Sequence, residues 1–270
     1  VGDLGMILEN CLADADAMYI NDGAKISGKY GYDEKRGMFK WWKAFNEMEN
    51  LVGNAEVDNF SVDGAGSLTG SIDGAGGANT LDVSTATGAV TVNLATGAAT
   101  PFNSNGAGGF SNIGAFTGDN TNDTLVGPNG GATFTTTGEN DGTVASVTYT
   151  DFANITGGTG ADIFNLNHDV TGTVDGGDDA DTFNLTNGVS IGTLTGGSGG
   201  TDNDTLALLD VIPATQTNDW VIDSVDGGTV EGQAFTEMEN LTGNEDNDVF
   251  TFTAALTGTA SGGVEDDTFA

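Results

Sequence analysis

One short pattern recurs along this chain and constrains its fold more than any other feature. The pattern is a glycine, four variable residues, an Asp or Asn, one further residue, and then Phe or Leu. Seven copies keep this spacing: Gly53–Phe60, Gly74–Leu81, Gly118–Leu125, Gly157–Phe164, Gly176–Phe183, Gly243–Phe250 and Gly262–Phe269. An eighth copy, Gly196–Leu206, contains an insertion. A repeat that opens with glycine and closes with a large apolar side chain is typical of chains that wind into stacked units.

The spacing of the copies predicts the type of unit. Their Asp or Asn positions are 21, 44, 39, 19, 23, 44 and 19 residues apart, so most gaps are near twenty and the others near twice that. Apolar and polar residues alternate between the copies, as in Phe164–Leu166 and Val170–Val174, which indicates short strands. We therefore predict an all-β fold, a parallel β-solenoid (β-helix or β-roll) with rungs of about twenty residues. The side chains expected to stack in its core are Phe60, Phe164, Phe183, Phe250 and Phe269.

Disorder is the alternative for a chain this rich in glycine and acid. The 44 glycines suit tight turns equally well, because glycine accepts positive φ and close backbone approach. A random low-complexity sequence would not keep Phe or Leu two places after the motif Asp. The pattern therefore favours a folded repeat protein.

The charge distribution points to cation binding or to a salty environment. The formal net charge is −34, and all six basic residues lie between Lys25 and Lys43. Stacked units would bring the motif acids into a column of carboxylates that repel one another. Calcium suits such a column, because it accepts carboxylate and carbonyl oxygens in flexible geometry.

A family resemblance supports the same interpretation. The segment 157–165, GGTGADIFN, is similar to the nonapeptide of the RTX, or haemolysin-type calcium-binding, repeats. The segments 90–100 and 235–250 resemble large repetitive bacterial surface proteins and adhesins. The resemblance implies a parallel β-roll or β-solenoid and bound calcium. The chain departs from the family pattern because only one turn of each unit keeps the motif.

Calcium, if bound, would be held by motif acids, above all where two copies follow each other directly. The predicted metal ligands are Asp162, Asp178, Asp179, Asp181, Asp204, Asp248 and Asp267. The alternative is that these Asp and Asn side chains stabilise turns by accepting hydrogen bonds from nearby backbone amides.

A longer repeat suggests the domain organisation. Ala44–Asn54 and Ala234–Asn244 match at nine of eleven positions, 190 residues apart. Residues 1–43 differ in composition and hold Cys11, the only cysteine. We predict that residues 1–43 form an N-terminal cap or docking segment and that residues 44–270 form the solenoid. Copies of the chain are expected to associate end to end into an oligomer or filament.

Few residues are suited to catalysis. One histidine, His168, and one cysteine occur, and no nucleophile elbow or phosphate-binding loop is found, so we do not expect an enzyme. A carbohydrate-active β-helix stays open as an alternative because carboxylates are plentiful. The negative charge disfavours nucleic-acid binding, and no apolar run is long enough to span a membrane.

These features together predict a non-enzymatic structural segment of an extracellular or cell-surface fibre, surface layer or giant adhesin. The alternative is a calcium-binding RTX-type secretion and folding module of a larger secreted enzyme or toxin.

Overall fold

The computed structural model describes residues 18–21, 29–33, 38–42, 50–66, 68, 70–100, 109–199, 203–209 and 217–270. Every regular element within these ranges is a β-strand, and many strands pair in parallel. The predicted all-β class is therefore confirmed. The chain divides into two compact units, residues 1–92 with 96–119, and residues 93–95 with 120–270.

The predicted N-terminal segment, residues 1–43, is described only in three strands. These are β1 (Met18–Asn21), β2 (Lys29–Asp33) and β3 (Met38–Trp42), of which β2 and β3 pair antiparallel. The prediction that this segment caps the fold or docks a partner concerns mainly residues outside the described ranges, Cys11 among them.

The first unit consists mainly of two parallel sheets. One has the order β1-β5-β7-β11 and the other the order β4-β6-β10. Their further strands are β4 (Leu51–Val52), β5 (Asn59–Gly64), β6 (Ile72–Asp73), β7 (Thr80–Ala86), β10 (Phe110–Ser111) and β11 (Ala115–Thr117). Strand β9 (Ala98–Thr100) also lies in this unit, and β8 (Thr91–Asn93) crosses its boundary. The motif residue Phe60 is fully buried and pairs with Leu81 of the next copy.

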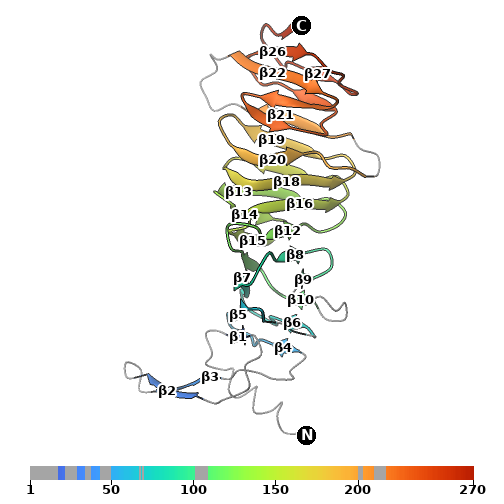
Figure 1. Cartoon of the computed structure of the whole chain (residues 1–270). Helices are drawn as coiled ribbons and strands as arrows, with labels where there is room; N and C mark the ends of the chain where they lie inside the picture. The colour runs from blue at the N-terminus through green and yellow to red at the C-terminus, as the bar shows by residue number, and fades with distance from the viewer. Residues whose placement is uncertain are drawn as a thin grey trace. The chain divides into compact units, whose positions relative to one another are not determined.

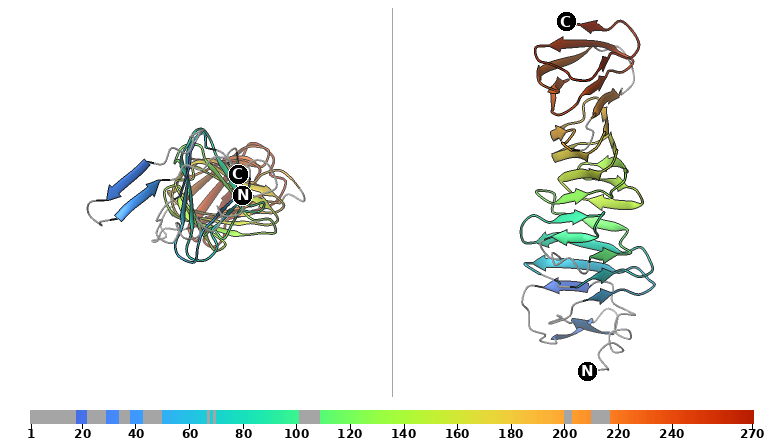
Figure 2. Two further views of the ribbon diagram at one scale, coloured as in Figure 1. Left: turned by 90° about the horizontal axis from the view of Figure 1, so that it is seen from below. Right: turned by 90° about the vertical axis from the view of Figure 1, so that its right-hand side faces the viewer.

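The second unit contains three sheets, whose strands lie one above another in Figure 1 and, seen from other directions, in Figure 2. The first sheet runs β15-β14-β13-β17-β19-β21-β25-β27, the second β20-β18-β16-β12 and the third β24-β23-β22-β26-β28. The strands before the insertion are β12 (Thr124–Val126), β13 (Thr133–Gly138), β14 (Asp141–Val144), β15 (Val147–Thr150), β16 (Asn154–Thr159), β17 (Ile163–Leu166), β18 (Val170–Asp178), β19 (Thr182–Thr186) and β20 (Ile191–Thr195). The strands after it are β21 (Thr205–Leu209), β22 (Thr217–Ser224), β23 (Gly227–Val230), β24 (Gln233–Phe235), β25 (Asn240–Thr242), β26 (Asn247–Phe252), β27 (Ala260–Ser261) and β28 (Thr268–Phe269).

Strand register follows the sequence motif. Phe164 pairs with Phe183, and Phe183 pairs with Leu206 of the following copy. The apolar residue that ends each motif therefore lies directly over its counterpart. Because side chains alternate across a strand, the flanking Thr and Asn residues face solvent while these apolar residues face the core.

Aromatic rings stack along this core. The ring centroids of Phe134 and Phe164 lie 4.7 Å apart with planes 10° from parallel. Trp220 and Phe250 stack in the same way, with centroids 5.1 Å apart. The predicted core residues Phe60, Phe164, Phe183 and Phe250 are fully buried. Phe269 stacks on Phe250 at 4.9 Å, as predicted, but unlike the other four rings it is 52% exposed.

The two longest motif gaps of the second unit contain antiparallel meanders. Strands β13, β14 and β15 fill the gap before Asp162, and β22, β23 and β24 fill the gap before Asp248. Parallel pairing, which the sequence predicts throughout, does not hold there. Hairpins form because Asn140 and Asp226 turn the chain with positive φ, at 58° and 52°.

The meanders belong to an 86-residue repeat that the motif search missed. Residues 133–184 align without a gap to residues 219–270, with 17 of 52 positions identical. Equivalent bonds recur at this offset. The Thr171 amide donates to Oδ1 of Asn140 at 2.8 Å, and the Thr257 amide donates to Oδ1 of Asp226 at 2.6 Å.

Candidate functional site

The motif acids form a ladder of hydrogen bonds between successive copies of the motif. The backbone amide of Asp162 donates to Oδ1 of Asp181 at 2.7 Å, and the amide of Asp181 donates to Oδ1 of Asp204 at 2.7 Å. The amide of Asp248 donates in the same way to Oδ1 of Asp267 at 3.0 Å. We call this set the motif ladder: Asp58, Asn79, Asp162, Asp181, Asp204, Asp248 and Asp267.

The hydrogen-bond partners of the ladder change where a meander separates one motif copy from the next. The amide of Asp204 donates to Oε2 of Glu239 at 2.6 Å, whereas the preceding ladder amides donate to motif Asp residues. Upstream, the Ala132 amide donates to Oδ1 of Asp162 at 2.5 Å. Each bond thus gives a partly buried backbone donor its acceptor.

The geometry of the ladder explains the glycine of the motif. A Cβ atom on Gly176 would lie 2.1 Å from the carbonyl oxygen of Gly196 and 2.2 Å from Oδ2 of Asp181. On Gly157 it would lie 2.1 Å from the carbonyl oxygen of Gly176. The spacing Gly-x4-Asp therefore reflects a turn in which the carboxylate folds back over its own glycine, leaving no room for a side chain.

The Nδ2 atom of Asn79, which corresponds to Oδ2 of the ladder Asp residues, shows the surroundings of this second terminal atom. This Nδ2 donates to the carbonyl oxygens of Gly74 at 2.7 Å, Gly76 at 3.0 Å and Asn112 at 2.9 Å. A carboxylate at this position presents an oxygen, not a donor, to the same ring of carbonyl oxygens. An additional hydrogen or a cation would satisfy that arrangement.

Asp162 presents this arrangement most clearly. The residue is 1% exposed, and its Oδ2 has no hydrogen-bond partner among the described residues. This oxygen and the carbonyl oxygen of Gly176 both face the space beside Gly157. Burial raises the pKa of Asp162 to about 6, partly offset by the hydrogen bond from the Ala132 amide.

Asp248 has more hydrogen-bond donors around it. Burial raises the pKa of this carboxyl group, while bonds from Trp220, Asn218 and the Asn244 amide lower it and the nearby Asp267 raises it. The indole N–H of Trp220 donates to Oδ1 of Asp248 at 2.8 Å. A core tryptophan thus satisfies its N–H through the ladder.

The structure separates the predicted metal ligands into two groups. The ladder contains Asp162, Asp181, Asp204, Asp248 and Asp267. Asp178 and Asp179 instead lie at the turn that ends β18, where Asp179 has a φ of 73°.

The predicted ligands are of the type that binds calcium. Carboxylate and carbonyl oxygens are the ligands that calcium prefers. The carboxylate oxygen Oδ2 of Asp162 and the carbonyl oxygen of Gly176 face the same space. Within the described ranges, however, no three Asp, Glu, His or Cys side chains gather closely enough to form a metal group. Calcium binding therefore stays a prediction. The ladder carboxylates accept hydrogen bonds from backbone amides, as in the turn-stabilising alternative, but these bonds run between motif copies and not within one turn.

A second ladder, of asparagines, was missed by the sequence analysis. Oδ1 of Asn154 accepts from the Thr173 amide at 3.0 Å, and Oδ1 of Asn240 accepts from the Thr259 amide at 3.2 Å. Oδ1 of Asn50 accepts likewise from the Ser71 amide at 2.9 Å. The sequence signal is Asn-(Leu/Ile)-(Val/Thr)-Gly, in which the glycine is the first residue of the motif.

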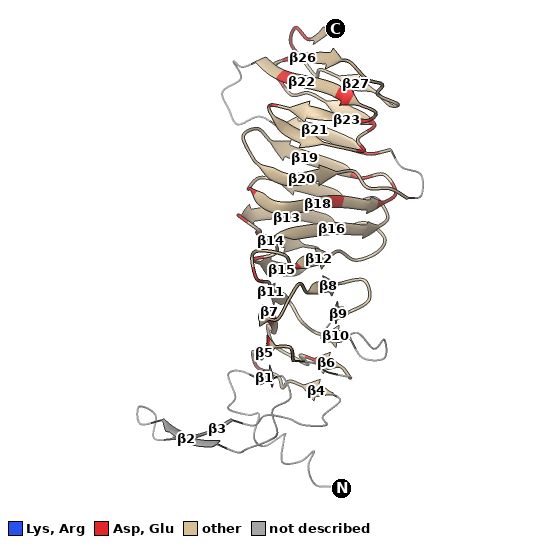
Figure 3. Ribbon diagram, viewed as in Figure 1, with Lys and Arg blue, Asp and Glu red and all other residues tan. Residues whose placement is uncertain are grey.

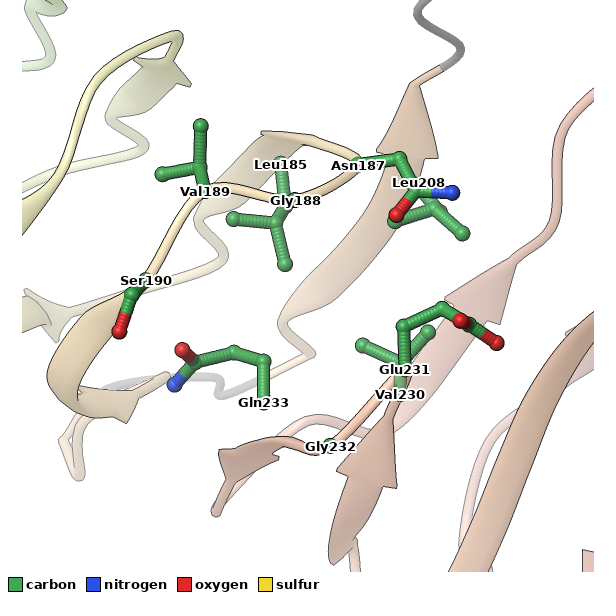
Figure 4. A pocket seen from close by; sticks show the side chains of 10 residues that line it. All are labelled: Leu185, Asn187, Gly188, Val189, Ser190, Leu208, Val230, Glu231, Gly232 and Gln233. Atoms are coloured by element: carbon green, nitrogen blue, oxygen red, sulfur yellow. The ribbon is translucent and has the colours of Figure 1, made fainter.

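A cavity of about 240 Å³ lies between the turn after β19 and the turn after β23 (Figure 4). Its lining is mixed, with Leu185, Val189 and Leu208 beside polar side chains. Glu231 is the one ionisable side chain among the described residues that line it, and it accepts a hydrogen bond from the Asp219 amide at 2.6 Å. The described lining residues therefore contain no carboxylate pair of the kind that the carbohydrate-active alternative requires.

Acidic residues gather at turns and strand ends, as Figure 3 shows for the second unit. Among these acids, Asp175 has its pKa raised by burial and by the neighbouring Glu237, partly offset by a bond from the Gly177 amide. Residues 50–270 contain no Lys or Arg to neutralise them. In the part of the chain that the structure describes, no helix is long and apolar enough to cross a membrane.

Comparison of the chain with protein-family models and with curated proteins finds no match.

Proposed function

We propose that this chain is a non-enzymatic structural segment of an extracellular fibre, surface layer or giant adhesin, built as a parallel β-solenoid. Each rung of about twenty residues would comprise two strands and the motif turn. The work of such a segment is to hold other parts of a surface assembly at a distance and to associate with further copies.

The observation that carries this proposal is the coincidence of three registers between the same rungs. Strand β17 pairs in parallel with β19, the rings of Phe164 and Phe183 stack at 4.8 Å, and the amide of Asp162 bonds to Asp181. These two neighbouring units are thereby fixed to each other by strand pairing, ring stacking and a side-chain hydrogen bond. Solenoid stability is a sum of such neighbour terms, so a chain of this kind can extend without a larger core.

Small-angle X-ray scattering on the 270-residue chain tests the solenoid. A globular protein of the same length would have a radius of gyration of about 18 Å. We expect a radius of gyration well above this value, and a correspondingly large maximum dimension. A radius near that value would refute the proposal. Electron microscopy of the same sample tests association, for which fibres or end-to-end oligomers are expected.

A calcium-binding secretion and folding module, as in RTX proteins, is the second candidate function. The buried Oδ2 of Asp162, directed toward the same space as the Gly176 carbonyl oxygen, favours it. Melting in calcium and in chelator at matched ionic strength provides the test. A calcium-dependent rise that magnesium does not reproduce, and that Asp162→Asn reduces, would support this candidate over a purely structural role.

A further inference from the structure

One surface of this acidic protein has no charged side chain among the residues that the structure describes on it. It is the solvent side of β13, β17, β19 and β21, which we call the neutral face. The buried residues of these strands are apolar, such as Phe134, Phe164 and Phe183, and the positions between them are Thr, Asn, Ala, Ile, Leu or Gly. Figure 3 shows no Asp or Glu on β13, β19 or β21.

The side chains of the neutral face form rows across the strands. Thr182 pairs with Thr205 on one row, and Asn165 pairs with Asn184 on the next. Within a row, side chains on adjacent strands lie ~4.8 Å apart. Successive rows lie ~6.6 Å apart, because every second residue of a strand lies on the same face. The face is therefore a two-dimensional array that consists mainly of hydroxyl and amide groups and is interrupted by Ile163, Ala207 and Leu209.

Hydrogen bonds within the array hold its side chains in place. Nδ2 of Asn184 donates to Oδ1 of Asn165 at 2.9 Å, and the Thr186 hydroxyl donates to Oδ1 of Asn167 at 3.1 Å. Threonine is also restricted at χ1 by its branched Cβ. A partner that docks here would immobilise little additional side-chain freedom, which lowers the entropic cost of binding.

Charge identifies the kind of partner. A cationic partner would be drawn to the acidic turns, and an anionic partner would be repelled by them. The neutral face has no charge to pair with, so an uncharged surface suits it best. Threonine and asparagine present both donors and acceptors, as the hydroxyl groups of sugars do. Each such bond is weak in water, but a periodic array can engage many at once.

We propose that the neutral face docks an insoluble, uncharged polysaccharide of extended chains. This inference rests on the proposed role as a surface or adhesive segment and names the class of target. The solenoid proposal is judged by scattering, so the two can fail separately.

Co-sedimentation of the 270-residue chain with microcrystalline cellulose tests the inference. The wild type is expected to bind, with an affinity unchanged between about 0.05 M and 0.5 M NaCl, because no charges take part. Thr182→Glu and Thr182→Lys are each expected to weaken binding about tenfold or more, since either charge would be desolvated against a neutral surface. Thr205→Glu on the adjacent strand should act alike.

Glu245→Lys provides the matched control, since it reverses a charge on an exposed turn outside the neutral face and should leave binding unchanged. Circular dichroism shows that each variant compared is folded. Failure of the wild type to bind, equal binding by folded Thr182 and Thr205 variants, or binding that falls with salt would overturn the inference. The inference would also be overturned if the wild type sedimented without cellulose and the Thr182 variants did not. That result would mean that the neutral face binds a second copy of the chain.

Discussion

Phe164 lies on Phe183 with ring centroids 4.8 Å apart and ring planes within 4° of parallel. The two residues are 19 positions apart in sequence, and the same offset joins the Asp162 amide to Asp181. Core packing and the motif ladder therefore depend on a single register. A shift of one strand by one residue would turn the ring to solvent and break the ladder bond together.

Phe183→Ala should destabilise the protein by about 3–5 kcal/mol, because it removes a fully buried ring that lies between the neighbouring strands β17 and β21. Urea unfolding followed by far-UV circular dichroism measures the loss. Ile163→Ala, at an exposed position of the paired strand, is the control and should change the unfolding free energy by less than about 1 kcal/mol. Equal losses in the two variants would contradict the stacked core.

Gly176→Ala should destabilise the protein by about 1–3 kcal/mol or more, because its new methyl group would overlap the Gly196 carbonyl and the Asp181 carboxylate. Gly114→Ala is the matched control, since a Cβ there meets nothing within 4 Å. Thermal melting of the two variants makes the comparison. A Gly176→Ala protein as stable as Gly114→Ala would show that the turns do not pack as described.

Asp162→Asn should stabilise the protein at neutral pH, because the new amide can donate to the Gly176 carbonyl as Asn79 donates to Asn112. The gain should depend on pH. The pKa of Asp162 rises from 3.8 to about 6 on folding, so its stabilising contribution is complete below pH 3.8 and lost as the pH rises through 6. The melting-temperature difference between variant and wild type should therefore grow from pH 4 to pH 7.

Asp178→Asn, in the exposed turn, is the control for that pH series. A difference between Asp162→Asn and wild type that stays constant across the series would argue against a buried carboxyl group that takes up a proton on folding.

Asn154→Ala should cost about 1–3 kcal/mol, because it leaves the Thr173 amide without its side-chain acceptor. Asn240→Ala should cost a similar amount through Thr259. The two sites share no bonds, so the losses should add in the double variant to within about 0.5 kcal/mol. Denaturant unfolding of both single variants and the double variant checks this, and a marked departure from additivity would mean that the asparagine ladder acts as one unit.

The motif predicted the strand register because its chemistry is local. The burial of Phe164 and Phe183 follows from alternation, and the recurrence of Asp two places before Phe predicts a repeated turn. The antiparallel meander after β22 could not be predicted from the motif, because its hairpin depends on positive φ at Asp226 in a segment without the motif glycine.

The role of the acids was harder to read from sequence. A column of Asp residues suggests cations, yet a carboxylate that accepts from a backbone amide follows the same spacing. Only the position of Oδ1 relative to the amide of the previous motif copy distinguishes these two interpretations. The neutral face was also hidden, because the net charge of −34 masks the fact that the acids avoid certain strands.

The motif ladder has a consequence for how genes of this type can change length. Asp181 and Asp204 each accept a hydrogen bond from the motif amide of the preceding copy, so deleting one whole copy in frame within this run joins a donor to an equivalent acceptor. Duplicating a copy does the same. Recombination between similar coding repeats can therefore shorten or lengthen such a protein over generations without creating an unmatched turn.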